Sequence, residues 1–308
     1  MLRATVCIFG NFLTDIGSWI GGFFADAIRS SVIDSVRWMT NLTTNSMSKT
    51  LDNAISQVSE TPQSFNPGIF TILETFTNQV LVPIGILILS VLLFYELIDT
   101  LLDKNSTNDT VNIQWFIKWS IKFVLGIFIV TNTWGIVNGI MEFLAGVTRW
   151  GATVIQGSAI DNSANLMAQI EAELATAGFG TLISTFVGVL IGRVLMWILN
   201  LFIYYVLIAR MIEIYLIISM SPIAMSTFVN KEWNVGNNYI KKLIAKGVQA
   251  LLIVVILAMS GAIQGVVLSQ SYGSDAWGLI GAMLITYVVV AMMMFKTGSI
   301  ANSIVGAN

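Results

Sequence analysis

The sequence has no histidine, a single cysteine and only four prolines among its 308 residues. Histidine is the commonest general base and the commonest metal ligand, so its absence removes both roles. The single cysteine, Cys7, excludes an intramolecular disulfide and a cysteine-type metal site. The sequence also contains no GxxxxGK[ST] phosphate loop and no GxGxxG turn. We therefore expect no enzymatic activity and no cofactor.

Charge is scarce as well, because Asp, Glu, Lys and Arg together make up 10% of the residues. Soluble domains carry about 25%. Hydrophobic residues reach 56%, and the mean hydropathy is +0.80. A chain of this composition needs lipid as its main solvent, which predicts an all-α, polytopic transmembrane helical bundle. The net charge of −2 gives no overall field that would attract nucleic acid.

The N-terminal region, residues 1–68, combines a predicted amphipathic helix with a polar linker. Within residues 11–39, apolar side chains such as Phe12, Trp19 and Phe23 recur at helical spacing between charged ones. A helix of this kind can lie in the membrane interface or pack against spanning helices, and both interpretations fit. Residues 40–68 are rich in Ser, Thr and Asn, which indicates a polar connection.

Long apolar segments predict about five membrane spans. Residues 69–146 hold the first two, at about 80–101 and from Trp115 onward, and Pro83 falls in a first turn, where its missing N–H costs nothing. Residues 147–180 are polar, which indicates a central extracytoplasmic loop with a short helix at about 165–176. Residues 181–308 form a C-terminal transmembrane region with a cytoplasmic elbow, 210–247. Its spans begin at 181 and lie at about 248–270 and 277–295.

The apolar stretch that begins at Thr181 is too long for one simple crossing. Pro222 disfavours helix at Ser221, so the helix should end near there. About 40 residues give roughly 60 Å, about twice the hydrocarbon thickness. The helix therefore either breaks near Arg210 or protrudes from the membrane. Serines at 219, 221 and 226 can bond backbone groups that the break frees.

Positive charge decides between five and six spans, because short cytoplasmic loops gather Lys and Arg. If residues 181–209 cross once, most cations fall on one side and Arg149 alone lies in the central loop opposite. A second crossing there would give six spans and weaken this bias. We therefore favour five spans, with the N-terminus outside and the C-terminus in the cytoplasm. The cations on the cytoplasmic side are Lys104, Lys118, Lys122, Arg210, Lys231, Lys241, Lys242, Lys246 and Lys296.

Ionisable residues inside predicted spans are costly and mark either function or pairing. Arg193 could contact a pore or a substrate, but an ion pair with Glu142 or Glu96 is the favoured interpretation. Glu96 and Asp99 are three residues apart and share a helix face. They could bind a cation, although carboxylates that reach the membrane interface from a helix end are commoner.

Local spacing predicts two further features. Arg210 and Glu213 are three residues apart, which predicts an intrahelical ion pair with a structural role. Glycines four residues apart allow close approach of helices and indicate a packed bundle or a homo-oligomer. Such spacings occur at Gly135/Gly139, Gly188/Gly192 and Gly261/Gly265.

Five stretches within residues 80–308 are distinctive in sequence. They are "VPIGILILSVLLFYELI" (82–98), "FIKWSIKFVLGIFIVTNTWGIV" (116–137), "ARMIEIYLIISMSPIAMSTFVNKEW" (209–233), "NYIKKLIAKGVQALLIVV" (238–255) and "AWGLIGAMLITYVVVAMMMFKTGSIANSI" (276–304). In these stretches the chain resembles the TrbL-like polytopic membrane subunits of conjugative type IV secretion systems. It resembles most the form carried by conjugative elements of Gram-positive bacteria, on a plasmid or an integrative conjugative element. The 209–233 block is the most specific.

The resemblance implies a non-enzymatic channel or scaffold subunit in the bacterial cytoplasmic (inner) membrane. Such a subunit helps transfer relaxase-bound single-stranded DNA. The resemblance also implies homo-oligomers, contacts with other secretion subunits including ATPases, and allows transient contact with the DNA. Residues 147–180 are short beside the central loop of some Gram-negative relatives, so substrate contacts of a large loop do not carry over.

Two groups of residues make up the candidate site. The elbow is expected to dock a partner such as an ATPase through Arg210, Glu213, Ser221, Pro222, Lys231, Glu232 and Trp233. Lys241, Lys242 and Lys246 share a helix face and could contact DNA phosphate or anionic lipid, or could serve only to enforce topology.

The alternative function is a secondary transporter with a midplane polar site that uses Arg193 and Glu96. Transporters usually contain paired inverted repeats with broken helices. No second copy of the proline-broken pattern occurs in this sequence, which counts against a transporter.

Overall fold

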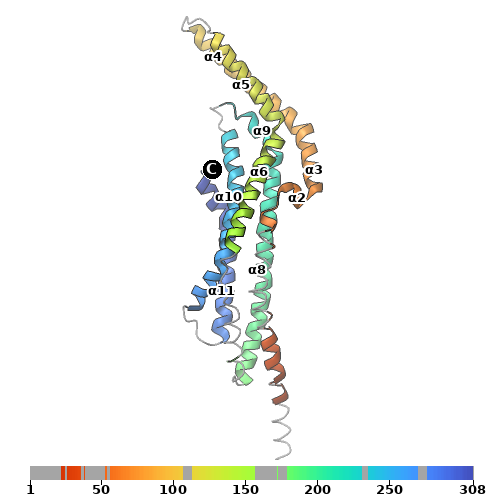
Figure 1. Cartoon of the computed structure of the whole chain (residues 1–308), viewed down its shortest axis with the longest axis vertical. Coiled ribbons are helices and arrows are strands. Elements are labelled where there is room, and N and C mark those ends of the chain that lie inside the picture. Colours follow the sequence, from red (N-terminus) through yellow and green to blue (C-terminus); the bar gives the residue numbers. More distant parts are fainter. Residues whose placement is uncertain are drawn as a thin grey trace, which may run out of the picture. The chain divides into compact units, whose positions relative to one another are not determined.

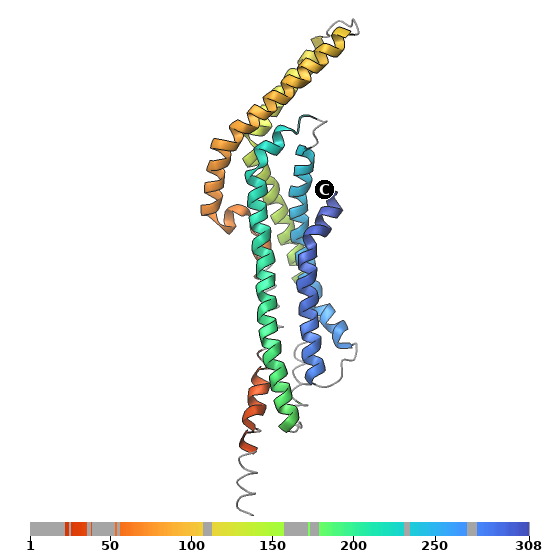
Figure 2. The same cartoon turned by 180° about the vertical axis from the view of Figure 1, so that it is seen from behind.

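The chain is helical throughout the part that the computed structural model describes, which is residues 22–24, 26–35, 38, 53, 56–106, 113–156, 172, 179–230, 235–269 and 276–307. Figure 1 shows the arrangement of these helices, and Figure 2 shows them from behind. The predicted all-α class is confirmed. In chain order the elements are α2 (Pro62–Phe65), α3 (Pro67–Phe76), the π-helix η1 (Thr77–Leu81), α4 (Val82–Ser106), α5 (Ile113–Thr131), α6 (Thr133–Gln156), α8 (Phe179–Ser219), α9 (Ser221–Ser226), α10 (Val235–Ser269) and α11 (Ala276–Val305).

Packing divides the chain into two units. The first comprises residues 1–52, 158–203 and 257–292, and the second comprises residues 53–157, 204–256 and 293–308. Helices α8, α10 and α11 each contribute residues to both units. The elbow, residues 210–247, belongs to the second unit.

In the part of the chain that the structure describes, four helical stretches are long and apolar enough to cross a membrane: Pro67–Leu102, Ser184–Ser219, Val235–Val267 and Leu284–Val305. A bent pair, Trp115–Thr131 and Thr133–Val154, adds a fifth crossing if it counts as one broken span. Length and composition therefore give four to five spans, in agreement with the predicted polytopic bundle.

The second predicted span is two helices, α5 and α6, which meet at 66°. Polar side chains at the junction bond back to carbonyls of the preceding turn. Asn132 Nδ2 donates to Phe128 O over 2.9 Å, and Thr131 Oγ1 donates to Ile127 O over 2.8 Å. Bonds of this kind compete with the helical ladder and bend helices. The sequence contains no proline at this bend, so its position was not predicted.

The first predicted span begins well before Val80, because α3, η1 and α4 form one continuous helical stretch from Pro67. The expectation that Pro83 lies in a first turn is therefore wrong. The π-helix η1 ends at Leu81, and α4 begins at Val82, the residue before Pro83. The Val82 N–H donates to Thr77 O. Proline lacks an N–H and crowds the preceding turn of a helix. The π turn is wider than an α turn, and it gives the proline ring room in this helix.

The start of this long stretch is set by local chemistry. Thr61 caps α2, with Ser64 N donating to Thr61 Oγ1 over 3.2 Å and Thr61 N donating to Ser64 Oγ over 3.0 Å. Asn66 caps α3 by accepting the Ile69 N–H on Oδ1 over 3.1 Å. Prolines follow both caps, where their fixed φ favours helix and no N–H is needed.

Helix α8 is a single helix that ends at Ser219, directly before Pro222. The predicted stop is confirmed, and of the two alternatives for this helix the break near Arg210 is wrong. Helix α6 continues to Gln156, so residues 147–156 of the expected central loop are helical. The short helix expected at about 165–176 falls outside the described residues, apart from residue 172.

Part of the N-terminal amphipathic helix is described, at residues 22–24 and 26–35. Val32 is fully buried, whereas Phe23 and Phe24 are exposed. Within the same unit, the Arg193 guanidinium lies 4.0 Å from the ring centroid of Trp38. This region therefore packs against α8 through one part of its surface.

The main core of the second unit joins α8 to α3, α6, α9 and α10. Phe70 of α3 meets Trp134 of α6, with ring centroids 5.0 Å apart. A second, smaller core holds the α4–α5 hairpin together, where Trp119 Nε1 donates to Leu93 O over 3.1 Å. The main core consists of Phe70, Trp134, Val137, Met141, Met211, Ile214, Tyr215, Ile218, Met225, Tyr239 and Leu243.

Of the three predicted glycine pairs, Gly135/Gly139 is the one whose surroundings the structure describes, and other glycines form the close helix contacts there. A Cβ on Gly135 or Gly139 would meet no atom within 4 Å, so this pair does not pack helices within the chain. A Cβ on Gly85 would instead lie 2.7 Å from Pro222 O, and one on Gly247 would lie 2.6 Å from Leu144 Cδ1. The contacting glycines lack a GxxxG partner, which is why spacing alone did not find them.

Candidate functional site

Helix α9 lies at the point where the bent helices of the second unit converge, and Figure 1 shows it beside the base of the α4–α5 hairpin. It contacts α4, α5, α6 and η1. Ser221 and Pro222 are buried, and the close approach of Gly85 leaves no room for a side chain against the Pro222 carbonyl. These two elbow residues therefore contribute to internal packing.

Side chains from distant parts of the chain satisfy the carbonyls at the end of α8. Tyr239 Oη donates to Ile217 O over 3.1 Å, and Thr77 Oγ1 donates to Ser219 O over 3.2 Å. Of the three serines expected to bond backbone groups, Ser219 and Ser226 bond the carbonyls three residues before them, whereas Ser221 Oγ is buried and forms no such bond. A helix end inside a protein requires such partners, because its last carbonyls have no N–H donors.

Thr227 joins the end of α9 to the start of α10. Its Oγ1 donates to Ala224 O over 2.8 Å and accepts the Gly236 N–H over 2.9 Å. Gly236 is required here, because a Cβ would lie 2.7 Å from Phe228 Cα. The expected docking residues Lys231, Glu232 and Trp233 fall between these two points, outside the described residues.

Arg210 is buried in the second unit and does not form the predicted ion pair with Glu213. Its Nε and Nη2 both donate to Lys246 O over 3.3 Å, and its Nη1 donates to Val58 O over 3.3 Å. Glu213 forms its ion pair with Lys246 Nζ instead. The predicted pair is wrong because both side chains turn to α10, where a carbonyl and an amine lie within reach.

A segment that we call the strap, residues 58–62, is held by side chains of α6 and α8. Arg210 takes Val58 O, Arg149 Nε donates to Ser59 O over 3.2 Å, and Tyr215 Oη donates to Pro62 O over 2.6 Å. Val58, Ser59 and Pro62 are buried. The sequence analysis did not predict the strap. Its signal in the sequence was the presence of Arg210 and Tyr215 in an apolar helix, because each of these side chains needs a polar partner when it is buried.

Through Arg210 the strap also lies next to α10. One guanidinium donates to Val58 O and to Lys246 O over 3.3 Å each, so these two residues, far apart in sequence, are neighbours in the second unit.

The three lysines of α10 differ in their surroundings. Lys246 Nζ pairs with Glu213 and lies 3.4 Å from Gln249 Oε1, and its side chain is only 14% exposed. Lys242 is exposed and Lys241 is half-buried. The shared face that the spacing predicts therefore leaves Lys242 and Lys241 as the residues that could meet phosphate or lipid.

The acidic residues of the predicted spans are placed separately. Glu96 forms an ion pair with Lys122 across the α4–α5 hairpin, with Glu96 Oε1 and Lys122 Nζ 2.6 Å apart. Asp99 and Glu142 are exposed. Within its own unit Arg193 lies over the Trp38 ring, and the pair predicted between Arg193 and Glu142 or Glu96 stays a prediction. Among the described residues, no group of three acidic or cysteine side chains could hold a metal ion.

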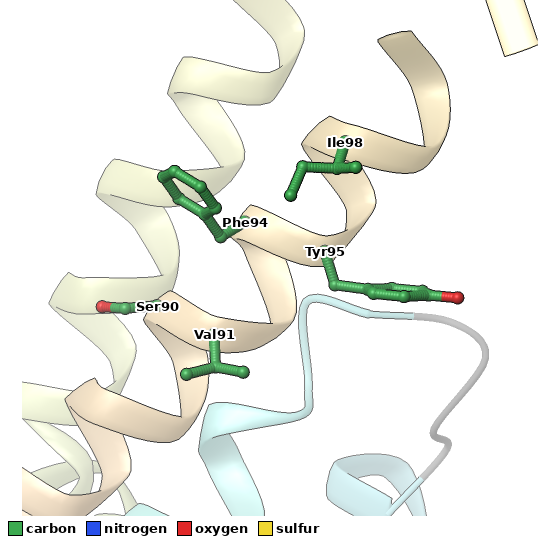
Figure 3. Close-up of a pocket in the computed structure, with 5 residues that line it drawn as sticks. All are labelled: Ser90, Val91, Phe94, Tyr95 and Ile98. Carbon is green, nitrogen blue, oxygen red and sulfur yellow. The ribbon is translucent and has the colours of Figure 1, made fainter. Parts of the chain in front are cut away.

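A shallow apolar groove of about 470 Å³ lies along one face of α4. Figure 3 shows Phe94 and Tyr95 on opposite sides of it, with Val91 and Ile98 between. Ser90 supplies a hydroxyl, which already donates to Ile86 O over 2.8 Å. The groove offers apolar contact and no acid or base for chemistry.

Comparison with known proteins gives a family match. The model of a family described as "TrbL/VirB6 plasmid conjugal transfer like protein" matches residues 47–222, which is more than half of the chain. No curated protein and no solved structure matches. The matched region runs from before the strap to Pro222, where α9 begins.

Proposed function

Because the chain belongs to the TrbL/VirB6 plasmid conjugal transfer-like family, we propose that it is a channel or scaffold subunit of a conjugative type IV secretion system. The family match is the observation that carries this proposal. Four to five apolar helices of spanning length support a multi-pass position in the bacterial cytoplasmic (inner) membrane. The proposal places the N-terminus outside and the C-terminus in the cytoplasm, as positive charge favours.

In this proposal the subunit helps move relaxase-bound single-stranded DNA and has no enzymatic activity of its own. Its partners are other secretion subunits, including ATPases, and further copies of itself. Large apolar side chains on α4 and α5 support such contacts, because they face away from the protein and need cover from lipid or another subunit. They include Leu87, Val91, Phe94, Val124 and Phe128.

The elbow remains the proposed docking point, with its contact surface moved outward. Ser221 and Pro222 face the core, whereas Met220 and Phe228 on either side of α9 are 53% and 47% exposed. A partner would therefore contact these apolar residues together with the segment that holds Lys231, Glu232 and Trp233. Arg210 and Glu213 would support the elbow from within.

An in-frame deletion of the gene in a donor strain tests the function. We expect conjugation to stop, and expression of the intact chain from a second plasmid should restore it. Normal DNA transfer from the deletion strain would overturn the proposal. Phe228→Ala should reduce transfer while the protein stays in the membrane at normal levels. Phe143→Ala is the same change at an even more exposed phenylalanine on α6, and serves as the matched control.

The alternative, a secondary transporter, gains no support from the polar residues. Its site would need Arg193 and Glu96 as ligands. Glu96 is paired with Lys122, and Arg193 is stacked on Trp38. The double change of Arg193 and Glu96 to Gln can be made in a strain that depends on this chain for conjugation. We expect it to cause no specific loss of transport.

A further inference from the structure

The strap is a short, irregular piece of chain inside the second unit. It leaves a helical turn at Val58 and has no regular structure at residues 60 and 61. Val58 is 1% exposed and Ser59 is 3% exposed, although both follow a polar linker. Irregular backbone that is buried in a membrane protein requires partners for its carbonyls, because neither lipid nor water supplies them.

Three of its carbonyls are bonded by side chains of distant helices. Arg210 and Tyr215 of α8 donate to Val58 O and Pro62 O, and Arg149 of α6 donates to Ser59 O. Thr61, in contrast, is held locally, since its carbonyl accepts the Phe65 N–H and its N–H donates to Ser64 Oγ. The carbonyls at 58, 59 and 62 thus depend on tertiary contacts. Loss of the contacts from α8 would leave the strap with no anchor on that helix.

Arg210 is the residue that links the strap to α10. The same guanidinium that holds Val58 O also holds Lys246 O, and the amine of Lys246 is paired with Glu213. Among the described residues Arg210 therefore has neutral carbonyls as its partners, at 3.3 Å each. A buried cation with long bonds to carbonyls gains much less than one paired with a carboxylate. This makes the seat of the strap easier to open than the packed core beside it.

We propose that the strap is a releasable lock on the contact between α8 and α10. When the strap is seated, Arg210 bridges it to α10. When the strap leaves, Arg210 loses its bond to Val58 O, and the contact between α8 and α10 loosens at Lys246 and Gln249. The seating of the strap and the packing of α10 therefore change together.

Cysteine accessibility of the full chain in native membranes tests this lock. Cys7→Ser removes the single native cysteine, and single cysteines then replace Ser59 in the strap, Gln63 just after it, or Gln249 of α10. Ser59 and Gln249 are buried and Gln63 is exposed, so we expect slow maleimide reaction at 59 and 249 and fast reaction at 63. The Ser59→Cys change is close to isosteric and should leave the seat intact.

Opening the lock should raise the reaction rates at both buried positions. Arg210→Gln should speed labelling at 59 and 249 by about tenfold, since the loss of one ordinary hydrogen bond to a carbonyl changes an opening equilibrium by about that factor. Arg210→Lys keeps the positive charge but loses the several N–H donors of the guanidinium, and should raise the labelling rates by less. Tyr215→Phe removes the bond to Pro62 O and should speed labelling at 59, and through the coupling also at 249. Glu213→Gln is the control; it touches Lys246 but no strap atom and should leave position 59 slow.

Several results would overturn the lock. One is fast labelling at 59 with Arg210 and Tyr215 intact. Another is slow labelling at 59 in both Arg210→Gln and Arg210→Lys, each with a normal size-exclusion profile. A rise at 59 in Tyr215→Phe with no change at 249 would refute the coupling. An equal rise at 59 in Glu213→Gln would show general loosening of α8.

Discussion

Individual residues of this chain find their partners far away in sequence. Arg210 bonds a carbonyl 36 residues later and another 152 residues earlier, and passes over the acid three residues away. The i,i+3 rule describes isolated helices in water, where local pairs are the ones available. In a packed bundle the same side chains turn inward. For this reason the sequence identified Arg210 as structural but not what it holds.

At the residue scale, Gly85 provides the sharpest test of the elbow. Gly85→Ala would place a methyl group 2.7 Å from Pro222 O, a backbone atom that cannot move aside alone. We expect a loss of about 1–3 kcal/mol, as for other overpacked sites. Gly135→Ala is the matched control, since its Cβ would meet no atom within 4 Å and alanine favours helix. Thermal unfolding of both variants in detergent checks this, and equal melting temperatures would contradict the proposed close packing.

At the element scale, apolar length and proline predicted most of the helices but not their bends. Long hydrophobic runs gave the spans, and Pro222 gave the end of α8, because both effects act locally along the chain. The bend at Asn132 and the π turn before Pro83 depend on how side chains share carbonyls with the helical ladder. Many helices contain similar residues without bending. Tertiary contacts decide, and a single sequence does not show them.

The end of α8 yields a prediction at this scale. Thr77→Val keeps the shape of the side chain and removes the bond to Ser219 O, which is buried. We expect the free energy of unfolding to fall by about 1 kcal/mol, the usual net value of such a bond. Thr75→Val is the control, because Thr75 bonds Thr71 O within its own exposed helix face. Chemical denaturation in detergent measures the difference, and a smaller loss for Thr77→Val than for Thr75→Val would argue against this cap.

For the whole molecule, the chain's family and multi-pass class could be predicted from sequence, whereas its threading through the membrane was only partly constrained. The charge count treated Arg210 and Lys246 as solvent-facing cations. The structure shows Arg210 buried and Lys246 paired, so both contribute less to the positive-inside bias than the count assumed. The exposed Lys242 remains a sound marker of sidedness.

Sidedness gives the prediction for the whole molecule. Because Arg210 joins the strap to α10, cysteines at Gln63 and Lys242 should react with a membrane-impermeant maleimide from the same side in the Cys7→Ser background. Intact cells and inverted vesicles provide the two directions of access. Reaction of the two cysteines from opposite faces would mean that the strap and Lys246 are not neighbours in the membrane.

The order of synthesis adds a consequence for the end of α8. Its carbonyls depend on Thr77, which is made long before it, and on Tyr239, which is made after it. Of the two carbonyls that Arg210 binds, Val58 O is synthesised before Arg210 and Lys246 O after it. During biogenesis α8 therefore inserts with half of its polar partners missing, and the elbow reaches its final form only once α10 has emerged from the ribosome.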